Sequence, residues 1–465
     1  MKIDVIVAEV GSTTTVVNAF HGIHNDNPTF IGQGMAKTTV DLGDVTIGLY
    51  EALADLQKNL KVDSLDVQET FATSSAAGGL KMSVHGLVYD MTAKAAKEAA
   101  LGAGANVHLV TAGNLNKFDI EKIKKIKPNI IMIAGGVDYG EYQTALFNAY
   151  EIANLHLNTP VIYAGNIVNI EDVKAIFEQA EQCDYLHITD NVYPKIDVLQ
   201  VEPARKIIQD VFEKHIIHAP GMEKVKSIVN QHIIPTPGAV MLSALLLEQI
   251  IGDLVVIDVG GATTDVHSVT SGSIEVNKIL LNPEPFAKRT VEGDLGVFIN
   301  RNNIIEMIGQ KQLMKDTALS EDELSEVLSR YQAIPTGKQI QVVERLTLEA
   351  VNKSIIRHAG KYASIYATSG KTKVAEGKDL TSVNYIIGTG GALTRLPKKE
   401  EILMQMVEKQ DGISLKPTKS AQVLIDHDYI MASIGVLSMN YPQAAIKLLK
   451  QSLKIGESYV SKNHH

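Results

Sequence analysis

The sequence contains the stretch Asp258-Val259-Gly260-Gly261-Ala262-Thr263-Thr264-Asp265, in which an apolar run ends in a carboxylate, one further residue and a turn rich in glycine and hydroxyl groups. The N-terminal stretch Ala8-Glu9-Val10-Gly11-Ser12-Thr13-Thr14-Thr15 follows the same plan. Glycine lets backbone N–H groups approach an anion and the hydroxyls add donors, so such a turn suits a polyphosphate. The repetition predicts two related halves that close on one nucleotide.

A third glycine-rich segment, Gly388-Thr389-Gly390-Gly391-Ala392, follows another apolar run and leads to Arg395-Leu396-Pro397. Glu9 and Asp258 stand at predicted strand ends, where a carboxylate suits a Mg²⁺ ion that keeps its waters. We therefore expect Glu9 and Asp258 to hold the metal through water. Both are candidate catalytic residues together with Asp265, which either positions the attacking water or caps the turn. The candidate nucleotide-binding residues are Gly11, Ser12, Thr13, Thr14, Gly260, Gly261, Ala262, Thr263, Thr264, Gly388, Gly390, Gly391 and Arg395.

The order of these segments resembles the phosphate-1, phosphate-2 and adenosine motifs of the actin, Hsp70 and sugar-kinase ATPase superfamily. Further segments make the chain similar to the MutL/GlmL family over nearly its whole length. This family comprises accessory proteins of glutamate mutase and related adenosylcobalamin-dependent mutases, and it is unrelated to the mismatch-repair protein of the same letters. The segments are Ser74-Ser75-Ala76-Ala77-Gly78-Gly79-Leu80, Ala134-Gly135-Gly136, Ala164-Gly165-Asn166, Pro235-Thr236-Pro237 and Arg289-Thr290-Val291-Glu292-Gly293-Asp294-Leu295-Gly296.

The resemblance implies an α/β protein with the actin-like ATPase fold, built of two ribonuclease-H-like halves with an inserted parallel βαβ domain. It implies ATP or ADP with Mg²⁺ as cofactors, with adenine on the third turn. Two positions depart from the pattern of such ATPases. Glu9 replaces the usual aspartate of the first hairpin, and Val16 stands where activator-type relatives often carry a basic residue. Both changes are consistent with slow hydrolysis.

Composition narrows the class of protein. The chain has 465 residues, which is too long for one core, and a net charge of −9, which argues against nucleic acid as a partner. The sequence has no apolar run long enough for a membrane span and no signal-peptide pattern at its start, so we expect a cytoplasmic protein. Cys183 is the only cysteine, and we expect it to be buried in a reducing compartment.

The 14 histidines show no metal-ligand spacing, and no Asp-x-His-x-x-Gly corrin-binding motif occurs. If cobalamin is involved, a partner therefore carries it.

Apolar runs separated by helical stretches, from residue 107 to about 200, predict the inserted parallel module. The expected division is residues 1–106 for the first half, completed by 425–465, then 107–232 for the insert and 233–424 for the second half. Gly135, Gly136 and Gly165 follow strands of the insert, where they either line a ligand site or only make tight turns.

Local signals add four expectations. Asp44 should cap a helix that ends near Leu60, and Thr92 should cap an alanine-rich helix. Residues 274–279 should form a strand. Arg289, Glu292 and Asp294 should lie in a charged, solvated loop, although the family resemblance gives this loop importance.

The function indicated by the resemblance is that of an ATP-binding accessory protein, or reactivase-like chaperone, for an adenosylcobalamin-dependent mutase. Subunits of such a mutase are the expected partners, and glutamate mutase, ornithine aminomutase and lysine aminomutase all stay open. One alternative is an enzyme, either a small-molecule kinase or an ATP-dependent amidohydrolase of the hydantoinase-A type. Another alternative is an actin-like scaffold.

Overall fold

The computed structural model describes residues 1–25, 27–75, 80–215, 221–367 and 370–456. Its first half is a five-stranded sheet with the order β10-β4-β1-β2-β3. Neighbours among β1, β2 and β3 are antiparallel, and β4 and β10 continue the sheet in parallel with β1. The strands are β1 (Lys2–Val10), β2 (Thr14–His21), β3 (Thr29–Lys37), β4 (Asp66–Ser74) and β10 (Ile233–Pro235).

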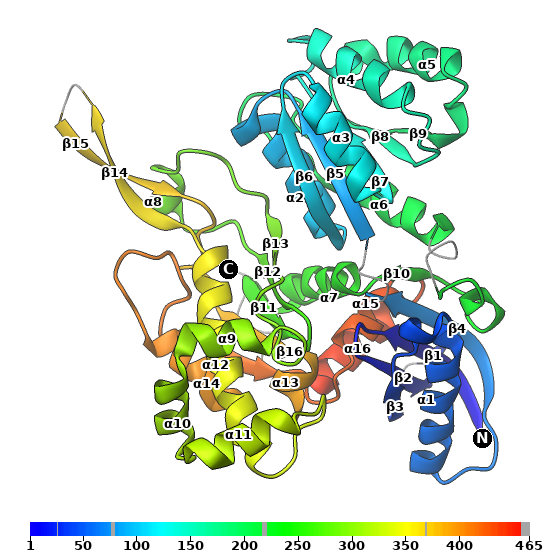
Figure 1. The fold of residues 1–465 in the computed structure, drawn as a ribbon, viewed down its shortest axis with the longest axis vertical. Helices are drawn as coiled ribbons and strands as arrows, with labels where there is room; N and C mark the ends of the chain where they lie inside the picture. Colours follow the sequence, from blue (N-terminus) through cyan, green and yellow to red (C-terminus); the bar gives the residue numbers. More distant parts are fainter. Residues whose placement is uncertain (26, 76–79, 216–220, 368–369, 457–465) are drawn as a thin grey trace.

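The second half repeats this topology, with the order β13-β12-β11-β16-β17 and the same pattern of antiparallel and parallel neighbours. Read from β3 to β10 and from β13 to β17, the two sheets have the same strand order. This confirms the two related halves predicted from the repeated turns and the actin-like fold implied by the resemblance. The strands are β11 (Leu254–Val259), β12 (Thr264–Val269), β13 (Ala287–Glu292), β16 (Tyr385–Thr389) and β17 (Gln422–Ile425), and a separate hairpin, β14 (Lys361–Ala367) with β15 (Gly370–Glu376), projects from the body (Figure 1).

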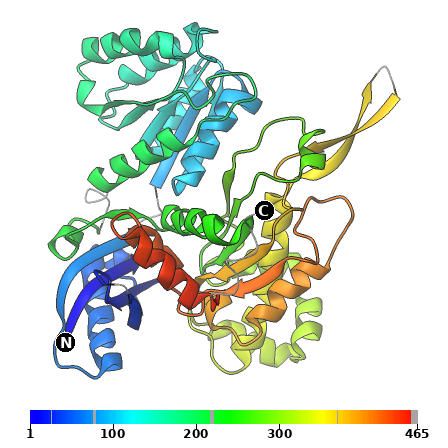
Figure 2. The same cartoon turned by 180° about the vertical axis from the view of Figure 1, so that it is seen from behind.

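The inserted domain stands above both halves and contains an all-parallel sheet with the order β6-β5-β7-β8-β9 (Figures 1 and 2). Its strands are β5 (Leu80–Gly86), β6 (Ala105–Ala112), β7 (Ile130–Ile133), β8 (Val161–Tyr163) and β9 (Leu186–Ile188). Because β5 pairs with β6 and β7, the expected start of the insert at residue 107 is too late. The sheet of the insert begins at Leu80, and α2 and the first residues of β6 also precede residue 107.

Helices cover these sheets and supply most of the apolar cores. One apolar cluster, which includes Val7 of β1 and Val256 of β11, surrounds α7 and α15 and joins the two halves. The helices are α1 (Val45–Leu60), α2 (Lys94–Gly102), α3 (Lys117–Ile126), α4 (Gln143–Ala153), α5 (Ile170–Gln179), α6 (Glu202–His215), α7 (Thr236–Ile251), α8 (Ile274–Asn277), α9 (Arg301–Ile308), α10 (Gln310–Thr317), α11 (Glu321–Ser329), α12 (Lys338–His358), α13 (Gly390–Arg395), α14 (Lys399–Glu408), α15 (Met431–Leu437) and α16 (Pro442–Ser452).

Several local expectations can be compared with the structure. Asp44 does cap α1, since its carboxylate accepts a hydrogen bond from Thr46 N. Thr92 does not cap α2: it lies in a π-helical turn, Tyr89–Ala93, and its hydroxyl accepts from Leu87 N and Val88 N. Residues 274–277 form the short helix α8 because Ser273 provides an N-cap. Cys183 is exposed, not buried. The motif residues 76–79 and the tail 457–465 lie outside the described residues.

Candidate functional site

The two predicted phosphate turns face each other at the junction of the halves. Gly11 N donates to Thr14 O over 3.0 Å in the first turn, and Gly260 N donates to Thr263 O over 2.9 Å in the second. The tips approach so closely that a Cβ atom on Gly261 would lie 3.0 Å from Thr13 Oγ1. Both turns therefore present backbone to one shared space, and only glycine fits at Gly261 without displacing its neighbour.

A polar pocket lies between these turns, and it brings together residues from both halves. Glu9, Asp258 and Asp265 all line it, so the structure gathers the three predicted carboxylates in one place. Tyr429 and Ser75 add hydroxyl groups to the wall. The remaining lining residues are Gly11, Ser12, Thr13, Thr14, Thr236, Pro237, Gly260, Gly261, Ala262 and Thr263.

Glu9 and Asp258 are held in surroundings that disfavour their charged forms. Glu9 is 6% exposed, and its Oε1 accepts a hydrogen bond from Tyr429 Oη over 3.2 Å. Its Oε2 has no hydrogen-bond partner among the described residues. Burial raises the pKa of Glu9 to about 7. Burial, and then the neighbouring carboxylates of Asp265 and Glu9, also raise the pKa of Asp258 well above its usual value. A bound cation would relieve both, and the unpartnered Glu9 oxygen is suited to a water of hydrated Mg²⁺.

Asp265 lies directly across the β11–β12 ladder from Asp258. Its Oδ1 accepts from Arg289 Nε over 2.8 Å and from Nη2 over 2.5 Å, while its Oδ2 accepts from Thr263 Oγ1 over 3.0 Å. The ion pair fixes the carboxylate at the edge of the pocket. Arg289 is therefore not in a solvated loop as expected: it lies in β13 and is 1% exposed.

The other two members of the expected charged loop behave differently. Glu292 ends β13, and Asp294 follows it in a turn. Both pair with Arg357 of α12, at 2.6 Å for Glu292 Oε2 and 2.7 Å for Asp294 Oδ1. These residues anchor the β13 turn to α12.

A mostly apolar cavity of about 250 Å³ continues from the polar pocket along the third glycine-rich segment. The two spaces share Thr13, Thr14, Gly260, Gly261 and Tyr429. At the far side of the cavity Phe298 and Tyr331 stack, with ring centroids 6.2 Å apart and an interplanar angle of 21°. The remaining lining residues are Val259, Val297, Gln332, Ala333, Ile334, Pro335, Ile340, Val343, Gly391, Ala392, Arg395, Leu396 and Pro397.

The third glycine-rich segment forms one wall of this cavity. Gly390 has φ +84°, and a Cβ atom there would lie 2.3 Å from Asp258 Oδ1, so glycine is required where the segment passes the carboxylate of Asp258. Gly391 and Arg395 line the cavity, whereas Gly388 contacts Leu403 and belongs to the packing of β16. Arg395 reaches across to the first half, since its Nη2 donates to Gln33 Oε1 over 3.3 Å.

Gly388, Gly390 and Thr264 are the three predicted nucleotide ligands that line neither space. The hydroxyl of Thr264 points to the loop after β13. Thr264 is buried, and its hydroxyl donates to Leu295 O over 2.7 Å. This bond is one of several that clamp the loop after β13 onto the second turn: Phe298 N and Ile299 N both donate to Gly261 O, over 2.9 and 2.8 Å. With its carbonyls occupied in this way, the turn is held by its neighbours in one conformation.

Sequence reasoning missed four residues of the site. Tyr429 has φ +53° and lies between Glu9 and the guanidinium of Arg395. Asp426 is 1% exposed and accepts from Thr389 Oγ1 over 2.9 Å and from Met431 N over 2.9 Å, which ties the third segment to α15. Phe298 and Tyr331 form the aromatic wall. All four come from segments without a turn motif, so no local signal marked them.

No helix in the described part of the chain is long and apolar enough to cross a membrane. The same residues contain no cluster of three or more His, Cys, Asp or Glu side chains placed to hold a metal ion directly.

Comparisons with known proteins agree with the sequence resemblance. The family model described as "MutL protein" matches residues 5–453. The curated "Protein MutL" of Clostridium tetanomorphum is 36% identical over 463 residues, which cover 96% of this chain and 98% of that protein.

Similar solved structures include a diol dehydratase-reactivating factor in nucleotide-free form, with 10% identity, TM-score 0.39 and coverage of 95% of this chain and 100% of that one. A glycerol dehydratase reactivase has 9% identity, TM-score 0.37 and coverage of 93% and 99%. A ROK family glucokinase from Streptomyces griseus, in complex with glucose and AMPPNP, has 9% identity, TM-score 0.33 and coverage of 94% and 98%. The family assignment depends on the sequence matches alone.

Proposed function

The chain belongs to the MutL protein family, and we propose that it is an ATP-binding accessory protein, similar to a reactivating chaperone, that serves an adenosylcobalamin-dependent mutase. One observation carries the nucleotide part of this proposal: two equivalent glycine turns face a single pocket that continues into an apolar cavity. The polar pocket suits phosphates, and the cavity suits a flat, apolar base. The shape and chemistry of a nucleotide therefore match the joined spaces.

In this proposal each half has its own task. The N–H groups of Ser12 to Thr14 and of Gly261 to Thr263 bind phosphate oxygens, as nest-like turns do, while Gly11 N and Gly260 N close their turns. Glu9 and Asp258 hold waters of Mg²⁺, which supplies charge neutralisation at the phosphates when it is bound. Asp265 is placed to accept a proton from an attacking water or to orient the turn. Phe298 and Tyr331 offer a stacking face for adenine, with Arg395 at the opposite rim.

The test of nucleotide binding is calorimetry on the purified, nucleotide-stripped protein. We expect ATP to bind in the presence of Mg²⁺ and to bind much more weakly with EDTA. No heat of binding at millimolar Mg-ATP would overturn the proposal. Transfer of phosphate only when a small acceptor molecule is added would favour the kinase alternative, and sedimentation of polymers on addition of ATP would favour the scaffold.

The contact with the mutase is proposed to lie on the inserted domain, at the carboxyl edge of its sheet. The amino ends of β5 and β6 face the ATPase body, because Leu80 follows the first half and Ala105 O accepts from Arg289. The opposite edge therefore points outward. Its loops expose apolar side chains that a globular protein ordinarily covers, at Tyr139 (83%), Tyr142 (47%), Ile167 (48%) and Val168 (51%).

The glycine-rich strand ends below these side chains are occupied by internal hydrogen bonds. Asn166 Oδ1 accepts from Tyr139 N and Val168 N, and Asp138 Oδ1 accepts from Ile167 N and Asn191 Nδ2. The polar residues therefore shape the loops, and the apolar tips remain for a partner.

Deleting residues 107–200 would strip β5 of its sheet neighbours, so point variants are the sharper test of this contact. We expect Tyr139→Ser and Ile167→Ser to weaken binding to a purified candidate mutase holoenzyme, measured by interferometry. Tyr150→Ser, in the last half of α4 on the same domain, is the matched control and should bind normally. Equal binding by all three variants would place the contact elsewhere.

A further inference from the structure

Arg289 uses all of its guanidinium nitrogens to connect two parts of the molecule. Nε and Nη2 donate to Asp265 in the polar pocket, as described above. Nη1 donates to two backbone carbonyls of the inserted domain, Ala105 O over 2.9 Å and Leu101 O over 3.2 Å. These carbonyls lie at the end of α2 and the start of β6, where the inserted domain joins the body. One side chain thus contacts both the pocket carboxylate and the base of the domain.

The guanidinium is suited to transmit movement between these contacts. It is planar and rigid, so the edge that binds Asp265 cannot turn without turning Nη1. It is also 1% exposed, and a buried charge that loses a partner is costly, so its contacts change together. A shift of Asp265 therefore displaces the groups that hold Leu101 and Ala105, or it breaks those bonds.

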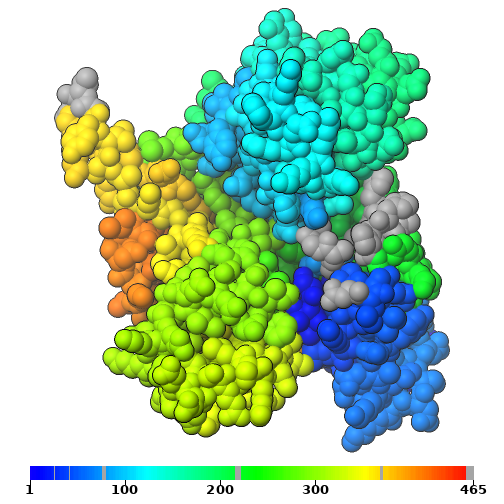
Figure 3. All heavy atoms as spheres, in the orientation of Figure 1, coloured from blue at the N-terminus to red at the C-terminus, as the bar shows by residue number. Residues whose placement is uncertain are grey.

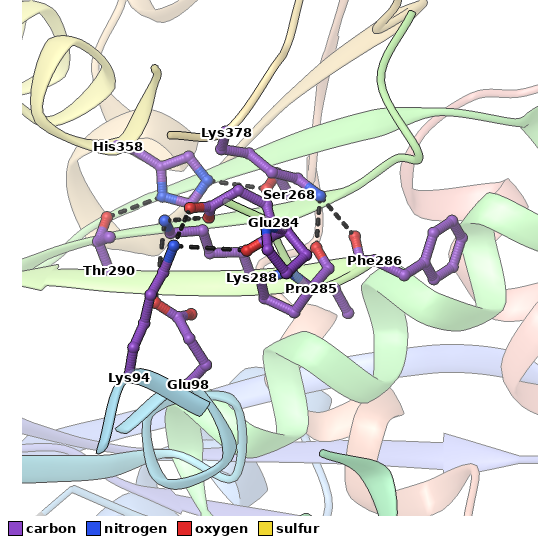
Figure 4. Close-up of polar contacts among 12 residues, drawn as sticks. Lys94, Glu98, Ser268, Glu284, Pro285, Phe286, Lys288, Thr290, His358 and Lys378 are labelled. Carbon is purple, nitrogen blue, oxygen red and sulfur yellow. Dashed lines mark hydrogen bonds and ion pairs between the residues drawn. The ribbon is translucent and has the colours of Figure 1, made fainter. Parts of the chain in front are cut away.

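A second set of charges, buried or half-buried, lies at the same junction and contacts the inserted domain without lining the pocket (Figure 4). Lys94 of α2 pairs with Glu284 at 2.6 Å, and Lys288 of β13 pairs with Glu284 at 2.5 Å and with Glu98 at 3.8 Å. Ion pairs tolerate reorientation better than interlocked apolar side chains do, because charge attraction depends weakly on angle. The junction is thus a polar hinge, with Arg289 as its only described link to Asp265.

We propose that Arg289 is a positioning residue that couples the phosphate pocket to the inserted domain, so that the occupancy of the pocket sets the position of the domain. The inference rests on the proposed nucleotide site and adds the route by which that site reaches the partner. When phosphates and their cation fill the pocket, Asp265 exchanges its hydrogen bonds with Thr263 and Arg289 for contacts with the new charges. Arg289 then adjusts, and the base of α2 and β6 moves with it. By linkage, a partner that binds the moved domain tightens nucleotide binding by the same factor.

The chain offers a matched control in Arg205 of α6, which is 4% exposed at the same junction. Its Nη2 donates to Ala287 O of β13 over 2.6 Å, and its Nη1 pairs with Glu202 at 2.5 Å. Arg205 therefore connects α6 with β13, and through a bond to Glu98 O of 3.4 Å with α2, but no hydrogen bond links it to Asp265 among the described residues. Arg205→Lys perturbs the junction, whereas Arg289→Lys keeps the charge and loses the planar fork that spans pocket and domain.

The test measures the distance between two nitroxide spin labels, one on the inserted domain and one on the second half, by double electron–electron resonance. The single natural cysteine, Cys183, is exposed on the inserted domain, and Ser325→Cys adds an exposed site on α11. We expect Mg-ATP to shift the distance distribution in this background and in Arg205→Lys. Arg289→Lys should still bind Mg-ATP by calorimetry and should lose the shift.

Three results overturn the inference. An equal shift in Arg289→Lys shows that the signal takes another route, and an absent shift in the parent protein despite Mg-ATP binding shows that the domain does not respond. Absent Mg-ATP binding by the parent overturns the proposed function as well, and calorimetry identifies that case. If Arg289→Lys does not fold, hydrogen exchange of residues 101–112 in the unmodified protein decides: Mg-ATP must change it, and identical exchange contradicts the coupling.

Discussion

The hairpins β1–β2 and β11–β12 have the same strand arrangement and close their turns with the same backbone hydrogen bond. They differ in the residue that lies opposite the carboxylate of the first strand. In β11–β12, Asp258 stands opposite Asp265, which Arg289 neutralises. In β1–β2, Glu9 stands opposite Val16, an apolar residue that is 1% exposed. The partner of Glu9 comes instead from Tyr429, 420 residues away. The halves thus share a backbone plan and differ in chemistry: the second half holds a linked set of charges, and the first supplies a single buried acid.

The largest expected effect comes from making the first hairpin imitate the second. Val16→Asp places a carboxylate opposite Glu9, to which no arginine of the described residues is hydrogen-bonded. An unpaired buried charge should lower the free energy of unfolding by about 3–5 kcal/mol, measured by urea denaturation. Val16→Thr, which adds only a hydroxyl, is the control. A Val16→Asp variant as stable as the parent would show that the first hairpin accepts a second charge and that the asymmetry is incidental.

Removing the charge of Asp258, the carboxylate of the second hairpin proposed to hold Mg²⁺, should have the next largest effect, on the rate of ATP hydrolysis. Asp258→Asn removes charge beside the phosphates, and by analogy with the loss of a transition-state donor it should slow Mg-ATP hydrolysis by about 10²–10³, followed as phosphate release. Glu9→Gln should slow it less, because Tyr429 already occupies one of the Glu9 oxygens. Equal losses would mean that the two carboxylates act alike, and an unaffected Asp258→Asn variant would move the catalytic metal elsewhere.

The third prediction concerns pH and the buried acid of the first hairpin. Because the pKa of Glu9 is raised to about 7 in the folded protein, the unfolded chain releases this proton first as the pH rises. Glu9 therefore destabilises the nucleotide-free protein progressively from about pH 4.5 to 7, by about 3 kcal/mol in total.

Glu9→Gln removes this cost, so it should stabilise the protein at pH 8 and leave it nearly unchanged at pH 4. Urea denaturation at both values tests the difference. The same stabilisation at both would assign the effect to packing.

The smallest expected effect tests a hydroxyl group within the turn of the second hairpin. Thr263→Val removes a proposed donor to the phosphates, which in the structure donates to Asp265 Oδ2, and should weaken Mg-ATP binding about fivefold, the effect of one ordinary hydrogen bond. Thr263→Ser keeps the hydroxyl and should restore binding in calorimetry. Failure of serine to restore it would attribute the loss to the shape of the side chain.

A partner could also contact the surface beside the inserted domain. Figure 3 shows a hollow between this domain and the β14–β15 hairpin, which projects from the second half. A movement of the inserted domain would therefore change the shape of the hollow as well as the position of the exposed carboxyl edge.

Much of the fold was predictable because its signals are local. The two carboxylate-glycine turns, the third glycine segment and the cap at Asp44 each depend on a few adjacent residues whose backbone conformation their own chemistry favours. The pairing of the turns in one pocket also followed, because two equal motifs in an α/β chain imply two equal halves. The candidate carboxylates Glu9, Asp258 and Asp265 do meet there.

Only the tertiary structure decided the roles of Arg289, Tyr429 and Leu80. A charged motif such as that around Arg289 is predicted to be solvated, because its sequence does not show that α2 of the inserted domain covers it. The contact between Arg289 and Ala105 joins residues 184 positions apart. Likewise, β5 enters the inserted sheet because β6 and β7 complete its hydrogen bonds, which no property of residues 80–86 alone reveals. The sequence by itself determined the chemistry of each turn, since that depends on neighbours along the chain. Which charges are buried, and what they connect, depended on packing between distant segments.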